Sequence, residues 1–585
     1  MTPATRHPNE ISGNTMQRMR SRYCWLLVVW FYTSDFAVAA GEGELLEAAR
    51  QQNWETVRAM LDQADANARQ ADGSTVLAWA VHWDEQVVAQ KLLGAGADPD
   101  IGNDYGVTPL FLAIKNRSEG MVRLLLKAGA DPNVSLWSGE KPLMTAAKAG
   151  NAEVVRLLLA HGVDVNTREP RRGQSALMWA ISFQHPDVAR VLIEQGADVE
   201  ARTTMLKEAF NPLVLEGFIL NVNVTPQGGY TPLMFAARAG DRETTQLLLE
   251  RGAEVNSVDH EHGPPLVIAA MEGNEDLALY LLEQGADPNL TDSNGMTALH
   301  YAMRDGLKPL HGYGYIGRSN TVVGRNKDVV LPGGNMYELA EALLAHGADP
   351  NAAIKYAPPR LRVRPARIPL FNLAGATPFL LAATVQDVRA MKLLLEAEAD
   401  PLIGTKIDND AFQREIRIHS SENQYIANAT PLMVAVGMGR RTDQGFSPEQ
   451  ESKALEAARL LVSLGADVNA ATASGWTPLH AAAFIGADTL VQFLLDTGAR
   501  MNVRNGCGQT PLSLALRAST RGLVEIELPD DVRESTAKLL VTRGADDKVA
   551  LQPVGECVLG REGLEYELEL QRKIRSVEKI NDSVL

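Results

Sequence analysis

A short phrase recurs along this chain at a constant interval, and this repetition limits the possible folds more than any other feature. Its clearest form is Thr-Pro-Leu, and successive copies begin 33 residues apart in several places, as between Thr75 and Thr108. A unit this short cannot bury its own apolar face, whereas a stack of such units buries a continuous core. The sequence therefore predicts a stack of repeats. The copies begin at Thr75, Thr108, Lys141, Ser175, Thr231, Pro264, Thr297, Thr377, Thr430, Thr477 and Thr510.

Each unit contains the signals of two helices and a turn. Proline suits the first turn of a helix because its missing N–H has no partner there, and the threonine before it can cap that helix. Leucine and two alanines then give the helix a narrow apolar face. A second helix carries a run such as Leu124-Leu125-Leu126 and ends at Gly-Ala-Asp, where glycine supplies a left-handed residue. A pair such as Asn294-Gly295 then predicts a hairpin turn.

The phrase Thr477-Pro478-Leu479-His480-Ala481-Ala482 resembles the signature of the ankyrin repeat, and Thr297–Ala302 is similar to it. This resemblance covers roughly residues 43–547. It implies an all-α solenoid of about 11–12 stacked repeats with short β-hairpin fingers, in which the fingers and first helices line a concave binding groove. The run Phe371–Ala383 further resembles large exported bacterial ankyrin repeat proteins that carry insertions between repeats.

Irregular spacing locates insertions, which are either functional loops or tolerated drift. Some lie between Gly-Ala-Asp and the next Thr-Pro-Leu, on the finger side, and others separate the two helices of one unit. The predicted order is a signal region 1–40, an N-terminal capping repeat 41–74, repeats 75–200, an insert 201–229, repeats 230–351 with an insert 305–336, a basic insert 352–376, a repeat 377–402, an insert 403–429, repeats 430–547, and a C-terminal cap or tail 548–585.

The N-terminus has the pattern of an export signal. Arg18, Arg20 and Arg22 precede an uncharged apolar run from Cys24 to Tyr32, and small residues follow. A basic segment, a short apolar segment and a small-residue site are typical of a secretory signal. We expect a periplasmic or secreted protein, cleaved near Ala39 or Ala40, with no stable membrane span after cleavage. A retained anchor is the alternative.

Composition narrows the chemistry. The formal net charge of −16 disfavours binding to nucleic-acid phosphates. Three cysteines are too few for a disulfide scaffold, and whether Cys507 and Cys557 pair stays open. Gly312–Gly317 fits a dinucleotide-binding pattern but lies in an insert and not after a strand, and Asp259–His262 lies at a hairpin tip where polar residues are common. We therefore expect no cofactor and no metal.

Two groups of residues are candidate partner contacts. Aromatic residues stand where fingers and first helices should face the groove, although local packing is the alternative for each. Trp79 and Trp179 replace an inner leucine and should be core. The basic insert contributes Arg360, Arg362 and Arg364, which could meet an acidic partner or this protein's own acidic surface. The aromatic candidates are Trp83, Tyr105, Trp137, Phe183, Tyr230, Trp476 and Phe484.

These features favour an exported, non-catalytic scaffold that binds a partner protein through its concave face. One alternative is an enzyme whose site is formed by the long inserts. Another is a secreted effector that binds a host protein. No catalytic constellation is evident, and His300 and His480 belong to the repeat phrase, where we expect them to bond to the backbone near the turn.

Overall fold

The structure is a computed structural model in which two compact units, Met1–Asp131 and Pro132–Leu585, are described separately. The predicted signal region lies outside the described residues except for Ala40, and the predicted tail 548–585 lies outside them entirely. The described residues are 40–61, 64–205, 213–215, 218–220, 228–259, 262–307, 333–355, 370–371, 373–406, 425–426, 428–439, 446–506, 508–516 and 533–546.

The first unit consists of three antiparallel helix pairs. In the second and third pairs the first helix begins at the second residue of the Thr-Pro-Leu position, and the second helix ends shortly before Gly-Ala-Asp. Each first helix packs against the first helix of the next pair, and α5 packs against α7 in the same way. The helices are α2 (Ala40–Arg50), α3 (Trp54–Met60), α4 (Val76–His82), α5 (Gln86–Gly94), α6 (Pro109–Lys115) and α7 (Glu119–Lys127).

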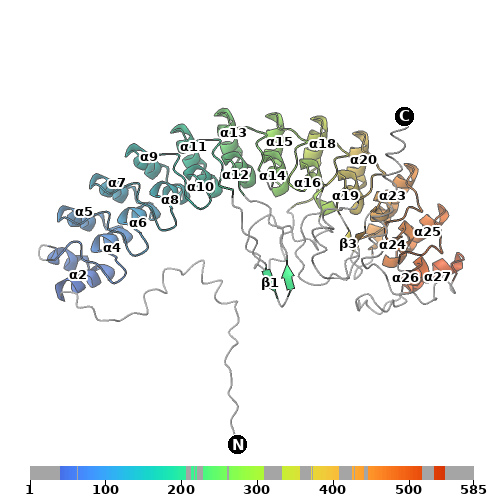
Figure 1. Cartoon of the computed structure of the whole chain (residues 1–585), viewed down its shortest axis with the longest axis horizontal. Coiled ribbons are helices and arrows are strands. Elements are labelled where there is room, and N and C mark those ends of the chain that lie inside the picture. The colour runs from blue at the N-terminus through green and yellow to red at the C-terminus, as the bar shows by residue number, and fades with distance from the viewer. Residues whose placement is uncertain are drawn as a thin grey trace, which may run out of the picture. The chain divides into compact units, whose positions relative to one another are not determined.

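The second unit continues the pattern with nine pairs in its described residues, so the predicted helical solenoid of about 11–12 repeats is confirmed. Figure 1 shows the pairs side by side along the unit. The first helices are α8 (Pro142–Ala149), α10 (Ala176–Ser182), α12 (Pro232–Ala239), α14 (Pro265–Glu272), α16 (Ala298–Ala302) with α17 (Arg304–Leu307), α19 (Pro378–Thr384), α22 (Pro431–Ala435), α24 (Pro478–Ile485) and α26 (Pro511–Ala515). The second helices are α9 (Ala152–Ala160), α11 (Pro186–Glu194), α13 (Arg242–Glu250), α15 (Glu275–Glu283), α18 (Tyr337–Ala345), α20 (Val388–Glu396), α23 (Pro448–Ser463), α25 (Asp488–Asp496) and α27 (Glu534–Thr542).

A ladder of asparagine side chains joins neighbouring repeats. Asn289, which follows the second helix α15, donates from Nδ2 to Gly347 O (2.9 Å) and accepts at Oδ1 from Asp349 N (2.7 Å). These partners belong to the next repeat, although the insert 305–336 separates them in sequence. Neighbouring repeats therefore stay in register across an insertion. The same pair of bonds is made by Asn67, Asn166, Asn256, Asn351 and Asn469.

The finger-side inserts leave the stack from closed backbone stems, and each stem bonds to the finger before it, as Lys355 N does to Asn294 O (2.8 Å). Such stems hold the repeat together whatever length of chain lies between them. Two short strand pairs lie in these segments, β1 (Leu213–Leu215) antiparallel to β2 (Phe218–Leu220), and β3 (Leu370–Phe371) parallel to β4 (Tyr425–Ile426). The stems are closed by bonds of 3.0 Å from Thr203 N to Tyr230 O, from Ile354 N to Ala376 O, and from Thr405 N to Ala429 O.

The two histidines of the repeat phrase have the expected backbone partners. His480 accepts the Thr477 N–H at Nδ1 (3.1 Å), so its Nε2 carries the proton and donates to Gln509 O (3.1 Å) in the next finger. His300 makes the same contacts with Thr297 and Ala376. Burial, partly offset by these bonds, lowers the pKa of each imidazole to about 4. Both side chains are thus neutral ties between repeats.

The glycine of Gly-Ala-Asp is left-handed as predicted, and the repeat that contains α20 has glutamate in its place. Gly347 has φ +85°, and a Cβ built there meets nothing within 4 Å. Glu398 occupies the same position after α20, with φ +64° and an exposed side chain. A residue with a Cβ is strained in this region by about 1–2 kcal/mol. The repeat around α20 therefore carries local strain at this position, which glycine would relieve.

We expect Glu398→Gly to raise the free energy of unfolding by about 0.5–1 kcal/mol, because relief of the left-handed strain exceeds the entropy that glycine adds to the unfolded chain. Gly347→Glu, the reverse change at the equivalent position, should lower it by a similar amount. Urea unfolding followed by circular dichroism measures both. Equal midpoints for both variants and the parent would contradict this account of Glu398.

Candidate partner-binding surface

The predicted aromatic contacts fall into an exposed and a buried group. In the first unit, Trp83 and Tyr105 are exposed. In the second unit, Trp137 is 78% exposed and Phe183 is 47% exposed. These four residues stand at two kinds of position, the tip of a finger for Tyr105 and Trp137, and the C-terminal end of a first helix for Trp83 and Phe183.

The prediction was wrong for Trp476, which is only 6% exposed. Its backbone pairs with Thr472 at the base of a finger, so its ring folds over α24. There the ring lies edge-on to Phe484, with centroids 5.6 Å apart, and tilted against His480 at 6.0 Å. Phe484 is half-buried for the same reason. The residue just before Thr-Pro-Leu therefore packs inward, whereas a residue at the fingertip points outward.

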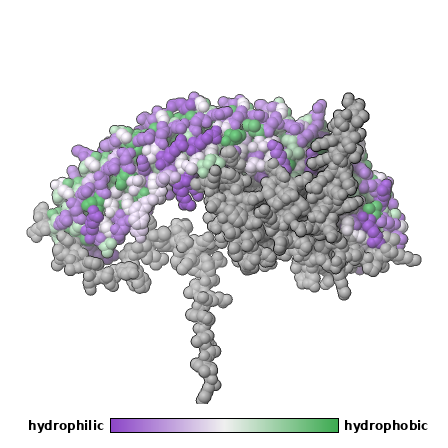
Figure 2. Space-filling view, in the orientation of Figure 1, coloured by the Kyte–Doolittle hydropathy of each residue, from purple (hydrophilic) through white to green (hydrophobic). Residues whose placement is uncertain are grey.

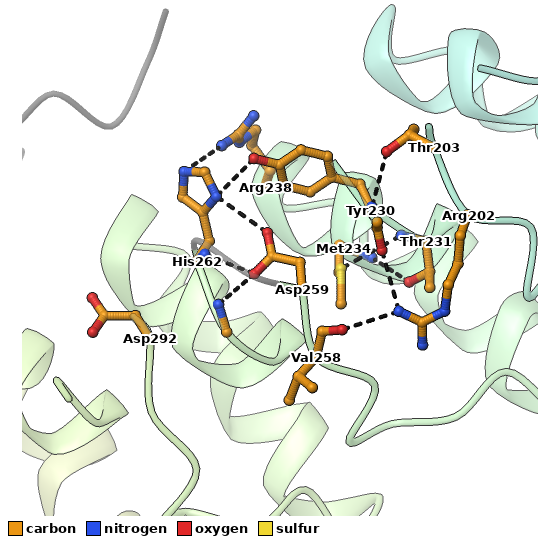
Figure 3. A network of polar contacts seen from close by, with 12 residues as sticks. Arg202, Thr203, Tyr230, Thr231, Met234, Arg238, Val258, Asp259, His262 and Asp292 are labelled. Atoms are coloured by element: carbon orange, nitrogen blue, oxygen red, sulfur yellow. Dashed lines mark hydrogen bonds and ion pairs between the residues drawn. The ribbon is translucent and has the colours of Figure 1, made fainter. Parts of the chain in front are cut away.

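Tyr230 occupies the same position as Trp476 and is also half-buried, at the centre of a polar network (Figure 3). Its hydroxyl lies 2.9 Å from His262 Nδ1, and His262 Nδ1 lies 3.3 Å from Asp259 Oδ2. Arg238 donates to His262 Nε2 (3.3 Å) and is 3.6 Å from Glu272. Because Nε2 accepts, Nδ1 carries the imidazole proton and faces the two oxygens.

This network connects two neighbouring fingers. Asp259 Oδ1 accepts the backbone N–H groups of His262 (2.7 Å) and Gly263 (2.6 Å), which fixes the turn, and the Asp259 side chain is fully buried. Arg202 donates to Val258 O (3.0 Å) and Gly229 O (3.2 Å) across the same gap. The predicted polar tip 259–262 thus has an internal structural role at Asp259 and His262, while residues 260 and 261 lie outside the described residues.

A cluster of aromatic rings around a lysine lies on α8 and α10. Lys148 Nζ is 5.3 Å from the centroid of Trp179 and 5.4 Å from that of Phe183, and the two rings are 6.3 Å apart. Trp179 is half-buried, so its predicted place in the core is wrong, and Trp79 is half-buried as well. Both tryptophans lie on the partly exposed side of a first helix. The equivalent position in α8 is occupied by Thr145, which is also half-buried.

The finger beside this cluster carries two exposed arginines. The buried carboxylate of Glu169 accepts the backbone N–H groups of Arg171 (2.7 Å), Arg172 (2.6 Å) and Gln174 (3.1 Å), which holds the finger closed. The two arginine side chains are left exposed at the tip. The preceding finger packs directly on this one, because a Cβ built on Gly139 would meet Pro170 at 2.2 Å. Trp137, which is two residues before Gly139, therefore stands on the adjoining tip.

We name this area the basic aromatic face. In the view of Figure 2, hydrophilic residues cover much of the described surface and hydrophobic ones form scattered patches between them. The face combines exposed rings with cations on adjacent repeats. Its members are Trp137, Lys148, Arg171, Arg172, Trp179 and Phe183.

Several predicted features fall where nothing is described. Arg360, Arg362 and Arg364, the motif Gly312–Gly317, and both Cys507 and Cys557 lie outside the described residues. Within the described ranges, no group of three or more His, Cys, Asp or Glu side chains could hold a metal ion. No helix of the described part has both the length and the apolar character needed to span a membrane.

The comparison with protein families matches four stretches of the chain to the model described as ankyrin repeats (3 copies), at residues 45–135, 134–203, 233–310 and 450–548. Together these stretches cover more than half of the sequence. The chain belongs to the ankyrin repeat family. Ankyrin repeats imply protein partners, and the basic aromatic face lies within the second of these matched stretches.

A search of solved structures finds the human ASB11 ankyrin repeat domain, whose crystal structure is 25% identical in sequence, with a TM-score of 0.34, over 42% of this chain and 98% of that chain. No curated protein matches the chain.

Sequence reasoning missed the cations of the basic aromatic face. Lys148 follows the two alanines of an ankyrin repeat by one residue, and Arg171-Arg172 stands at a fingertip, so their positions in the repeat mark them as exposed. The predicted groove contacts included only aromatic residues at these positions, so Lys148, Arg171 and Arg172 were not among them. Reading charge by position in the repeat would have found the face.

We expect Tyr230→Phe to lower the free energy of unfolding by about 0.5–1.5 kcal/mol, because one buried hydrogen bond to His262 is lost. His262→Ala should cost more, since the fully buried Asp259 carboxylate then loses its ring partner. Denaturant unfolding measures both changes. If Tyr230→Phe instead left stability unchanged, the hydroxyl would have no structural role in the network.

Proposed function

We propose that this ankyrin repeat protein is exported and acts in the periplasm or outside the cell as a non-catalytic scaffold that holds a partner protein on its fingers and first helices. The observation that carries the proposal is the basic aromatic face, where Trp137 and Phe183 are exposed on elements that are themselves rigidly bonded to their neighbours. Tryptophan and arginine are the residues most enriched among those that dominate binding energy at protein interfaces.

The rigidity of the stack supports this role. The fingers are closed by backbone bonds and by the Glu169 carboxylate, so the exposed side chains are placed before a partner arrives. Binding then orders few additional groups, which lowers its entropic cost. A stable complex would bury on the order of 1,200–2,000 Å² in total over the two partners.

Export rests on the N-terminal sequence. The arginines at 18, 20 and 22, the apolar run after them and the small residues to Ala40 form the pattern that a signal peptidase reads. In a cell fractionation of the native host, we expect the chain in the periplasmic or secreted fraction with its first residue at Ala40 or Gly41, as found by N-terminal sequencing. A cytoplasmic chain that retains its first 39 residues would contradict export.

Partner binding is tested with a tagged mature chain and chemical cross-linking in the same compartment. We expect Trp137→Ala with Phe183→Ala to lower the recovery of the stoichiometric partner at least tenfold, because both rings are exposed and contribute little to the core. The matched control is Leu464→Ala with Val541→Ala, two exposed apolar residues elsewhere in the unit. Equal recovery by both double variants, with equal thermal unfolding, would contradict the proposed surface.

A further inference from the structure

We propose that the basic aromatic face recognises an acidic, extended segment of the partner protein that carries apolar anchor residues. This inference rests on the proposed function and specifies the chemistry of the partner. It follows from three observations on the second unit: the separation of charge between the two sides of its repeats, three cations that have no carboxylate partner among the described residues, and the placement of rings beside those cations.

Charge separates between the two sides of these repeats. The fingers and first helices at residues 136–149, 167–183, 201–205 and 228–239 carry seven basic and two acidic residues. The second helices and their flanking turns, at residues 150–166, 184–200 and 240–256, carry four basic and ten acidic residues. A chain of net charge −16 therefore presents a net positive side here, and that side favours a negatively charged partner.

The cations on this side are not neutralised within the described part of the chain. Arg168 pairs with Asp198 and Arg238 with Glu272. Lys148, Arg171 and Arg172, in contrast, form no ion pair with a described carboxylate. Glu169, which lies two residues before Arg171, is buried, and both of its carboxylate oxygens accept hydrogen bonds from backbone N–H groups. Among the described residues, three charges of this face thus have no carboxylate partner.

The rings define a partner that is also apolar. Lys148 lies over both Trp179 and Phe183, so an apolar side chain that packs on either ring stands beside a cation. Trp137 offers a second apolar contact one finger away from Arg171. Anchors and carboxylates must therefore alternate along the ligand. Helices in contact lie about 8–10 Å apart, and an extended chain advances about 3.3 Å per residue, so about three ligand residues span each repeat.

This geometry favours a protein segment over a nucleic acid and over a second copy of the chain. Rings beside cations would also suit a single nucleic-acid strand, but the net charge of −16 disfavours binding to a phosphate backbone. A second copy could present its acidic second-helix side, but that side carries short charged groups on helices and not an extended strand with apolar anchors. Both alternatives give distinct results in the experiment below.

The probe is a fluorescent peptide of about ten residues in which every second residue is in turn acidic (Glu or Asp) and apolar (Leu or Phe), with serine between them, so that both kinds of side chain project from one face of the extended chain. Its binding to the mature chain is measured by fluorescence anisotropy. We expect saturable binding that weakens at least tenfold between 50 and 300 mM NaCl. Arg171→Glu with Arg172→Glu should weaken it at least tenfold, because both side chains are exposed and their backbone bonds to Glu169 are kept. Phe183→Ala should weaken it as well.

The matched control is Lys392→Glu with Lys538→Glu, which changes the net charge equally on exposed second-helix lysines and should alter binding less than twofold. Circular dichroism establishes that each variant is folded. Absence of peptide binding, or an equal loss in both charge-reversed variants, would overturn the inference. Equal or tighter binding of an oligothymidine strand would replace the protein segment with a nucleic acid.

Sedimentation of the mature chain tests the remaining alternative, in which a second copy of the chain occupies the face. A dimer that Arg171→Glu with Arg172→Glu converts to a monomer would make a second copy the occupant and would also overturn the inference.

Different results would contradict the scaffold proposal and the acidic-segment proposal. If Trp137→Ala with Phe183→Ala removes the native partner but the charge-reversed pair retains it, the scaffold stands and the acidic segment is wrong. If neither pair affects the partner, the surface itself is wrong.

Discussion

The structure depends on one constraint: a helix pair of this length exposes an apolar face that only a neighbouring pair can cover. Leu125 in the first unit and Leu158 in the second are fully buried in second helices that are too short to bury them alone. Everything else must preserve the contact between neighbours. The asparagine ladder does so at the ends of the second helices, and the neutral histidines His300 and His480 do so beneath the fingers.

The same constraint decides where the chain tolerates additional sequence. A long insert between Ile354 and Ala376 leaves both residues bonded to each other, and Lys355 still bonds to the preceding finger. Between α17 and α18, Met336 N–H donates to Ala302 O (3.0 Å) and Asp305 N–H donates to Asn335 Oδ1 (2.8 Å), which closes the other large gap. Insertions can therefore vary without separating two neighbouring repeats, which is how a strict period and long interruptions coexist in one chain.

The sequence was sufficient for features that the local backbone determines. Proline at the first helical position, threonine as the cap and glycine in the left-handed position follow from properties of single residues, and they hold from Thr75 to Thr510 with few exceptions. Side-chain direction was harder to predict, because it depends on the adjacent repeat. Trp476 and Trp137 are both finger tryptophans, yet one lies at the base over α24 and the other at the tip. Their positions in the repeat separate them, because Trp476 directly precedes Thr477 whereas Trp137 stands four residues before Lys141.

Charge distribution completes the link from repeat to function. In the early repeats of the second unit the acidic residues gather on the second helices, where like charges oppose association through that side. The fingers instead display Arg171 and Arg172, because Glu169 is occupied by the backbone of its own turn. A carboxylate that closes a finger is unavailable to neutralise its tip. The requirement that stabilises the finger thus also leaves its positive charge exposed, so local folding and the proposed partner recognition depend on the same residue.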